Sequence, residues 1–389
     1  MPAAPFDTKR LDALMDSAGM DVLLATSKHN VQYLRGGHRA FFFDYMDAVG
    51  ITRYLPVFIY PKGTPDKAAF IGHYMENFQH EVTPFWTPEV LAKATGSVDA
   101  MQKAIDYVKR SGVAAKCIGI EMAFLPTDAE TTLRKAMAGS ETIDALFTLE
   151  RLRARKTAEE LNLLKIASER VVDSMMAVIA NHGPGTTKAE LAEALRREEV
   201  NRGLTFEYLL VTCGQSLNRA PSGQRWEQGE VLSLDSGGNY HGYIGDVCRM
   251  AILGEPDGEL EDILGEIEEI QRTAMAPIKP GAIGGEIYAV AEERMSKSKH
   301  HNHMHFLAHG MGLVSHEAPR LTSTGPVRYD GYDVDKPLET GMVVSVETTV
   351  QHPKRGFIKL EDTVAVTDNG FEIYGEGGHG WNRGGTVLP

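Results

Sequence analysis

The sequence predicts two domains of different class, an α/β domain over residues 1–150 and an α+β domain over residues 151–389 whose antiparallel sheet carries helices on one face. Strand-like and helical segments alternate in the first part, whereas the second part combines long helices with paired strand-like segments. With 389 residues, 42% of them hydrophobic, the chain is long and apolar enough to form two buried cores.

The first domain opens with an amphipathic segment over residues 7–20 that is expected to form a helix. Helical patterns also cover 97–110 and 127–138. Apolar runs of strand length lie at 22–25, 55–60, 68–71 and 117–120. The aromatic segment from Phe41 to Tyr45 is expected either to join the core or a dimer interface, or to close over a small substrate.

The second domain is expected to begin with two capped helices. Thr157 and Thr187 are each followed three residues later by a glutamate, which is the capping-box pattern. The first of these helices should end near Ala180, because residues 181–185 contain glycine and proline. Two further helices are expected at 257–277 and 284–297.

Four acidic residues lie on strand-like apolar segments of the second domain. Asp235 follows an apolar run and precedes two glycines, and Asp246 lies on the expected return strand of a hairpin. Glu347 and Glu361 occupy similar positions on a second pair of segments. Because buried acids are costly unless they are paired, we expect these four carboxylates to share a cationic partner.

An imidazole completes the set. His309 lies in a segment that also holds His305 and His316, and its neighbours Gly310 and Gly312 allow the backbone to approach a ligand closely. Four carboxylates and one imidazole suit two divalent ions such as Mn, Co, Zn or Fe, which offset the negative charge. Such ions, roughly 3.5–4 Å apart, can share a water whose pKa falls towards ~7, so a hydroxide nucleophile is expected.

In their order and spacing these five residues resemble the ligands of the pita-bread metallohydrolases, the family of methionine aminopeptidase, aminopeptidase P, prolidase and creatinase. The resemblance runs through residues 155–370, and residues 30–37 are similar to a motif of the creatinase-type N-terminal domain. It implies a creatinase-like N-terminal domain over 1–150 and a pita-bread catalytic domain over 151–389.

The resemblance also implies a role for each ligand. Asp235 should chelate one metal ion, Asp246 and Glu361 should bridge both ions, and His309 and Glu347 should complete the second. Glu347 is in addition placed to shuttle a proton.

Further side chains are implied at the substrate. His316 matches the position that steadies the substrate carbonyl or the oxyanion, and His305 matches a histidine at the pocket edge. Candidate residues for the substrate pocket are Asn218, Lys359 and Trp226, with Arg219 and His379 as further candidates for its wall.

The chain also departs from the family pattern. Leu217-Asn218 stands where proline-specific peptidases carry Pro-His, Lys359 stands for an arginine, Cys248 for a threonine, and Thr348-Thr349 for Pro-Gly. A lysine at this position cannot form the pair of hydrogen bonds that the planar guanidinium group of arginine makes.

Three functions therefore remain open. The first is a hydrolase of a small amide or dipeptide-like substrate, similar to Xaa-Pro peptidases and using a hydroxide that bridges two metal ions. The second is a metal-dependent lyase, since Asn218 and Lys359 resemble the dimethylsulfoniopropionate lyase branch of the fold. The third is a non-catalytic peptide-binding module.

The composition of the chain limits the classes of partner that we expect. A net charge of −13 argues against nucleic acid, and neither an export signal nor a membrane-spanning apolar run is visible. Three widely spaced cysteines do not indicate a disulfide framework. We therefore expect a cytoplasmic enzyme that binds a small molecule or short peptide and forms a homodimer, with neither a nucleic-acid nor a membrane partner.

Overall fold

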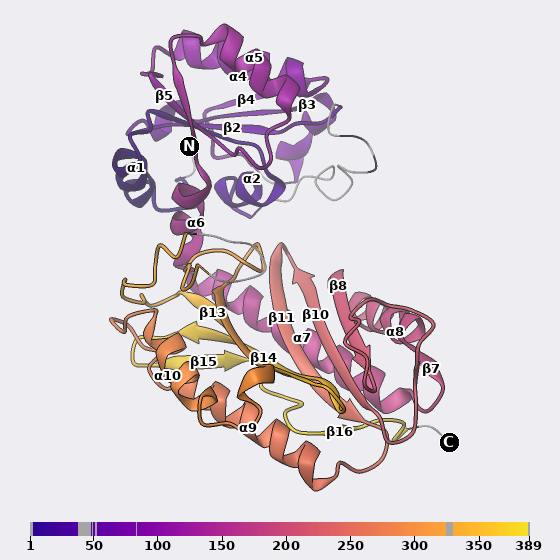
Figure 1. The fold of residues 1–389 in the computed structure, drawn as a ribbon. Coiled ribbons are helices and arrows are strands. Elements are labelled where there is room, and N and C mark those ends of the chain that lie inside the picture. The colour runs from indigo at the N-terminus through magenta and orange to yellow at the C-terminus, as the bar shows by residue number, and fades with distance from the viewer. Residues whose placement is uncertain are drawn as a thin grey trace. The chain divides into compact units, whose positions relative to one another are not determined.

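The computed structural model describes residues 3–37, 48, 50, 53–82, 84–323 and 330–387. The aromatic segment Phe41–Tyr45, expected at a core, an interface or a substrate, lies outside these residues. The chain divides into two compact units, Met1–Arg153 and Ala154–Pro389. Each unit has its own sheet and its own buried apolar clusters (Figure 1).

The first unit contains a six-stranded mixed sheet in the order β4-β3-β2-β1-β5-β6. Its strands are β1 (Val22–Ala25), β2 (Val57–Pro61), β3 (Ala69–His73), β4 (Glu89–Ala94), β5 (Cys117–Ile120) and β6 (Glu141–Asp144). Its helices are α1 (Thr8–Ser17), α2 (Lys28–Leu34), α4 (Ser97–Ser111), α5 (Thr127–Ala136) and α6 (Leu146–Ala154), and 3-10 turns lie at Pro65–Lys67, Tyr74–Glu76 and Gln79–Glu81.

Alternating residues of this sheet face two separate apolar clusters. On β2, Phe58 packs with Leu11 of α1, whereas Ile59 belongs to the cluster that holds Ile105 of α4 and Leu133 of α5. Because successive side chains of a strand point to opposite faces, helices cover both sides of the sheet. The α/β class expected for the N-terminal part is confirmed.

The second unit contains an eight-stranded sheet, whose main path runs β12-β13-β14-β11-β10-β8, while β15 pairs with β14 and β16 with β11. Its strands, together with the separate pair β7 and β9, are β7 (Thr186–Thr187), β8 (Thr205–Cys213), β9 (Arg225–Trp226), β10 (Val231–Tyr240), β11 (Tyr243–Ile252), β12 (Met304–Gly310), β13 (Val343–His352), β14 (Gly356–Val366), β15 (Phe371–Tyr374) and β16 (Asn382–Arg383). Its helices are α7 (Ala158–Asn181), α8 (Lys188–Asn201), α9 (Gly258–Met275) and α10 (Glu286–Met295), with a 3-10 turn at His301–His303.

Both expected capping boxes start the helices of this unit. The Thr157 side chain accepts a hydrogen bond from the Glu160 backbone and the Glu160 carboxylate accepts one in return, and Thr187 and Glu190 repeat the arrangement. These caps fix where α7 and α8 begin, and both helices pack against the β8–β10–β11 side of the sheet (Figure 1).

The sheet of the second unit separates apolar from ionisable side chains. On β14, Ile358 and Leu360 pack into the cluster that contains α9 residues, whereas Lys359 and Glu361 face the opposite side. The pairs along the main strand path are antiparallel, and helices α7 to α10 pack on one face (Figure 1). The expected antiparallel sheet with helices on one face is confirmed.

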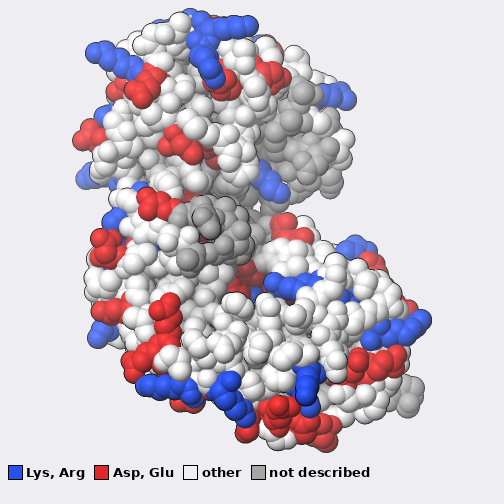
Figure 2. Space-filling model, viewed as in Figure 1, with Lys and Arg blue, Asp and Glu red and all other residues white. Residues whose placement is uncertain are grey.

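Within the described part of the chain, no helix combines the length and the apolar character needed to cross a bilayer. On the face shown in Figure 2, basic and acidic side chains are intermingled across the surface.

Candidate metal centre

Strand register brings the predicted ligands together. Glu347 on β13 lies directly opposite Glu361 on β14, and Glu361 in turn lies opposite Cys248 on β11. Asp235 on β10 is the partner of Cys248, so neighbouring strands carry all these positions. The carboxylates therefore meet although the residues are far apart in sequence.

The predicted ligands line a cavity of about 390 Å³ on the face of the sheet away from α9. Its wall contains all five predicted ligands and both further histidines. The lining residues are Tyr208, Leu210, Arg219, Asp235, Asp246, His305, Phe306, Leu307, His309, Ser315, His316, Glu347, Thr349, Lys359 and Glu361. A cavity of this size holds a ligand comparable to a dipeptide.

Three of the ligands form a compact group. Asp246, His309 and Glu361 each offer one ligand atom, and these atoms lie within 4.8 Å of one another. The His309 Nε2 atom lies 3.6 Å from an oxygen of Glu347 and 3.6 Å from an oxygen of Glu361. A divalent cation between them would complete these contacts.

The state of His309 supports this assignment. Its Nδ1 atom lies 3.3 Å from the Gly310 carbonyl oxygen, which favours a proton on Nδ1 and leaves Nε2 as the atom that can bind either a second proton or a metal ion. Among the described residues, the buried Nε2 atom has no hydrogen-bond partner. A buried nitrogen acceptor that faces two carboxylates fits a metal ion, so these residues pass the test for a divalent metal site.

The electrostatics of the cavity also favour a cation. Burial raises the pKa of Asp246 well above its usual range, and the nearby charges of Glu361 and Asp235 raise it further. Burial likewise raises the pKa of Glu347. Although burial alone lowers the pKa of His309, contact with Glu361 and the charge of Glu347 raise it to about 9. The site thus attracts positive charge.

Lys359 already supplies one positive charge to this cavity. Its Nζ atom lies 2.7 Å from Asp235 Oδ2 and 2.8 Å from Glu361 Oε2, and it also contacts Glu347. Burial lowers the pKa of Lys359, but these three carboxylates more than reverse the effect and hold it well above the usual value. Lys359, expected in the substrate pocket, therefore lies among the predicted ligands.

His316 and His305 both reach the cavity. The ring of His316 stacks on that of His309, with centroids 3.8 Å apart. Gly310 allows the segment after His316 to pack closely against β12, because a Cβ atom there would meet the backbone of Ala318 and Pro319 at 2.3 Å. His305, on β12, is exposed and lines the cavity. Their predicted roles at the substrate stay predictions.

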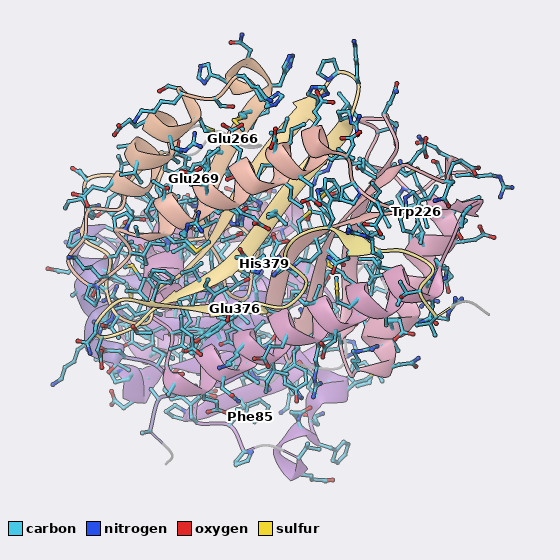
Figure 3. The ribbon with its side chains drawn as sticks, turned by 90° about the horizontal axis from the view of Figure 1, so that it is seen from below. Phe85, Trp226, Glu266, Glu269, Glu376 and His379 are labelled. Atoms are coloured by element: carbon cyan, nitrogen blue, oxygen red, sulfur yellow. The ribbon has the colours of Figure 1, made fainter. Side chains whose placement is uncertain are left out.

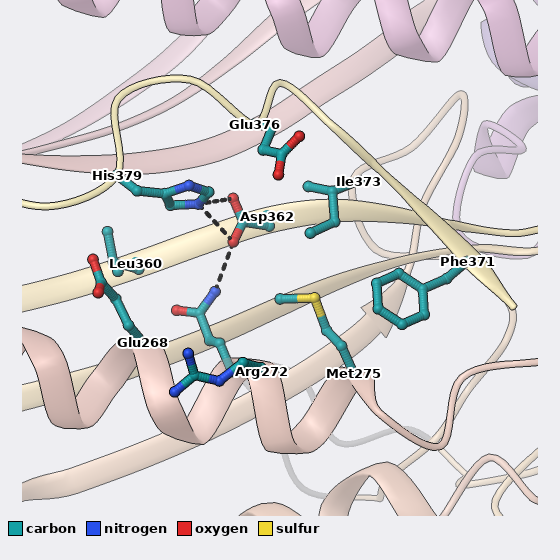
Figure 4. Close-up of a pocket in the computed structure, with 10 residues that line it drawn as sticks. Glu268, Arg272, Met275, Leu360, Asp362, Phe371, Ile373, Glu376 and His379 are labelled. Atoms are coloured by element: carbon teal, nitrogen blue, oxygen red, sulfur yellow. Dashed lines mark hydrogen bonds and ion pairs between the residues drawn. The ribbon is translucent and has the colours of Figure 1, made fainter.

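On the opposite face of β14, buried polar contacts hold this strand, which carries Glu361, in place. Asp362 is buried there, where it pairs with Arg249 at 2.9 Å. It also pairs with His379, a contact shown in Figure 4, at 2.9 Å. Arg249 also donates to the carbonyl oxygens of Cys248 and Glu361. A separate cavity of about 330 Å³, lined by Asp362 and His379, lies between β14 and α9. His379 thus lines this cavity rather than the metal cavity.

Two other candidates lie away from the metal cavity. Trp226, labelled in Figure 3, is fully buried in the apolar cluster between α7, α8 and the sheet, and its Nε1 donates to the Glu230 carbonyl oxygen. Asn218 is exposed, and its Oδ1 accepts from the Ala220 backbone. The expectation that Trp226 and Asn218 line the pocket is corrected by these positions: one fills the core and the other stabilises its own loop.

Several residues of the site were not anticipated from the sequence. Tyr208 on β8 hydrogen-bonds to Asp246, and Arg249 fixes the backbone of the glutamate ligand. An arginine within an otherwise apolar strand segment could have drawn attention to Arg249. Tyr208 gave no such signal, because tyrosine is an ordinary strand residue.

Residues 162–368 match the metallopeptidase family M24, and residues 8–155 match the creatinase/prolidase N-terminal domain. The uncharacterized peptidase YqhT of Bacillus subtilis is 26% identical over 370 residues, which cover 93% of this chain and 95% of that protein. The Xaa-Pro dipeptidase of Pyrococcus furiosus is 30% identical over 225 residues, which cover 56% of this chain and 62% of that protein.

Solved structures share the fold. A Bacillus anthracis Xaa-Pro dipeptidase superposes with a TM-score of 0.80 at 24% identity, covering 96% of this chain and 98% of that one. The prolidase of Pyrococcus horikoshii OT3 superposes with a TM-score of 0.77 at 22% identity, covering 95% and 97%. The two-domain resemblance noted from the sequence is confirmed.

Proposed function

The chain belongs to metallopeptidase family M24, and from this premise we propose that it hydrolyses the amide bond of a dipeptide-like substrate, with a specificity of the Xaa-Pro dipeptidase type. It is a metallohydrolase by family. The observation that carries the proposal is the single cavity of about 390 Å³ in which all five predicted ligands and His316 meet. The Xaa-Pro dipeptidase of Pyrococcus furiosus supports the choice of substrate class.

Some residues of the cavity would bind a metal ion, and others would act on the substrate. Asp246, His309 and Glu361 would hold a divalent ion such as Mn, Co, Zn or Fe, and Asp235 and Glu347 are the further ligands that led us to expect two ions. A divalent ion at such a site acts as a Lewis acid and lowers the pKa of bound water.

The remaining groups act on the substrate. Glu347, whose pKa burial raises, can accept a proton and pass it to the leaving nitrogen. His316, half-buried beside His309, would donate a hydrogen bond to the developing oxyanion. His305 lies in the exposed part of the cavity wall, where it can contact the substrate.

The lyase is the second candidate. Of the two residues that favoured it, Lys359 lies in the cavity and Asn218 does not. Lys359 could hold a substrate carboxylate beside the metal ligands, as a lyase of this type requires. The family assignment and the His309–His316 pair favour hydrolysis over elimination. A purely peptide-binding role does not explain why the ligand set is intact.

The test is a substrate panel assayed on metal-loaded protein. It contains Xaa-Pro dipeptides, matched Xaa-Ala dipeptides and dimethylsulfoniopropionate, with Mn²⁺, Co²⁺ or Zn²⁺ added to the chelator-treated enzyme. Release of proline by the wild type and not by Asp246→Asn supports the proposal. Acrylate release without amino-acid release establishes the lyase instead, and binding of peptides without turnover establishes the binding module.

Two further expectations accompany this function and stay predictions. We propose that the protein acts as a homodimer and in the cytoplasm, and the three cysteines, none of which forms a disulfide, are compatible with a reducing compartment. Size-exclusion chromatography with light scattering, and fractionation of cells, test them separately.

A further inference from the structure

The two ends of the ligand set differ in the cations that the protein itself supplies. At one end, Asp235 contacts both the Lys359 ammonium, at 2.7 Å, and the guanidinium of Arg219. At the other end, Asp246 is hydrogen-bonded by the neutral hydroxyl of Tyr208, and His309 Nε2 is without a hydrogen-bond partner among the described residues. The Asp235 carboxylate is thus already paired with two cations, whereas His309 Nε2 is still available to a metal ion.

Burial and three ion pairs hold the Lys359 side chain in this position. Its side chain is 6% exposed, and its backbone lies within β14, opposite Thr349 of β13. The three ion pairs of its Nζ atom are with Asp235, Glu347 and Glu361, all members of the ligand set. Moving the ammonium away would leave a buried charge without these partners, which is strongly unfavourable.

The sum of the charges in the cavity also favours a single divalent ion. Asp235, Asp246, Glu347 and Glu361 bring four negative charges to the cavity, and Lys359 and Arg219 bring two positive ones. His309 counts as neutral, because an imidazole must lose its extra proton to bind a metal ion. One divalent ion cancels the remainder, whereas two such ions would leave the cavity with an excess of positive charge. Buried sites favour the first arrangement, because an uncompensated buried charge costs free energy.

We propose that the Lys359 ammonium occupies one of the two cation positions of this ligand set, so that the protein binds a single divalent ion tightly, at Asp246, His309 and Glu361. Asp235 is then a partner of Lys359 and Arg219 rather than a metal ligand of the resting protein. This changes the expectation of two ions. It rests on the proposed function only in that both place a divalent ion in this cavity.

The consequence is unequal binding of successive ions. A second ion would have to approach Asp235 within a few ångströms of a positive ammonium, in a site shielded from water, where repulsion between like charges is strong. We expect the second ion to bind at least about tenfold more weakly than the first.

The experiment measures Mn²⁺ binding to the chelator-treated full-length protein, in the absence of substrate. Isothermal titration gives the stoichiometry, and electron paramagnetic resonance separates an isolated Mn²⁺ ion from an exchange-coupled pair. The wild type should bind one tight ion with an isolated-ion spectrum. In Lys359→Met a second ion should bind about tenfold or more tightly than in the wild type, with the spectrum of a coupled pair. Lys297→Met, at an exposed lysine on the surface, is the matched control and should behave as the wild type.

Two tight ions of similar affinity in the wild type would overturn the proposal without any variant, as would a Lys359→Met protein that folds but still binds one ion. If Lys359→Met does not fold, Lys359→Gln replaces it, and the wild-type stoichiometry still decides. Since no substrate is present, failure to cleave any peptide would overturn the proposed function and leave the ion count standing. Two tightly bound ions in a protein that cleaves peptides would overturn the proposed ion count and leave the proposed function standing.

Discussion

The imidazole ring of His316 lies nearly parallel to that of His309, with centroids 3.8 Å apart and 21° between the ring planes. A substrate that contacts an ion bound by His309 would therefore lie within reach of His316. Burial and the charge of His309 lower the pKa of His316 to about 3, so the ring is neutral at ordinary pH and carries one N–H donor.

We expect His316→Ala to lower kcat roughly 10²–10³-fold while leaving metal content unchanged, because an oxyanion donor is lost and the ligands remain. Because His316 does not titrate in this range, the ratio of wild-type to variant kcat should stay constant between about pH 5 and pH 9. Steady-state kinetics with metal analysis measure both. Loss of metal in His316→Ala would mean that His316 supports the metal site rather than the substrate.

Removing a ligand should have the opposite pattern. Asp246→Ala takes one of the three clustered ligands away, so we expect both metal content and activity to fall to background. Asp262→Ala, at an exposed position on α9, serves as the control and should retain both. An active Asp246→Ala protein with wild-type metal content would remove the assignment of the site.

The pair Arg249–Asp362 should be important for stability. Both side chains are buried and 2.9 Å apart, and Gln271 also donates to Asp362. Asp362→Ala would leave a buried guanidinium without its carboxylate, so the free energy of unfolding should fall by about 3–5 kcal/mol. Denaturant titration measures the change. A loss below about 1 kcal/mol, no larger than that of an exposed pair, would show that the buried pair does not stabilise the sheet.

A stability change with pH is expected from Glu199 on α8. This side chain is buried, and although its Oε1 atom accepts from Ser236, burial raises its pKa to about 7. The native state therefore binds a proton that the unfolded state has already lost, and stability falls as pH rises from about 4.5 to about 7. Glu199→Gln should remove this fall.

The measurement is the difference in unfolding free energy between Glu199→Gln and the wild type at pH 5 and at pH 8. We expect the variant to gain on the wild type by on the order of 2 kcal/mol between the two. Glu193→Gln, at an exposed position of the same helix, is the matched control. Equal pH profiles for Glu199→Gln and the wild type would show that Glu199 is ionised in the native protein.

Local sequence patterns were sufficient for much of the fold. The caps at Thr157 and Thr187 locate α7 and α8, and apolar runs locate the strands that carry Asp235 and Glu361. These signals depend on residues close together in the chain, which is why they can be identified without a structure. The order of the acids and His309 then indicated the family.

The sequence by itself determined the two domain classes, the helix starts and the five candidate ligands. Helix caps and strand periodicity depend on residues close together in the chain, and the order of the five ligands resembles that of a known family. Only the tertiary structure decided which side chains share the cavity. Lys359 lies beside Asp235 although 124 positions separate them, and Trp226 turns into the core although it was expected at the substrate. Strand register and the face that each side chain takes fix such contacts, and both are set by long-range pairing.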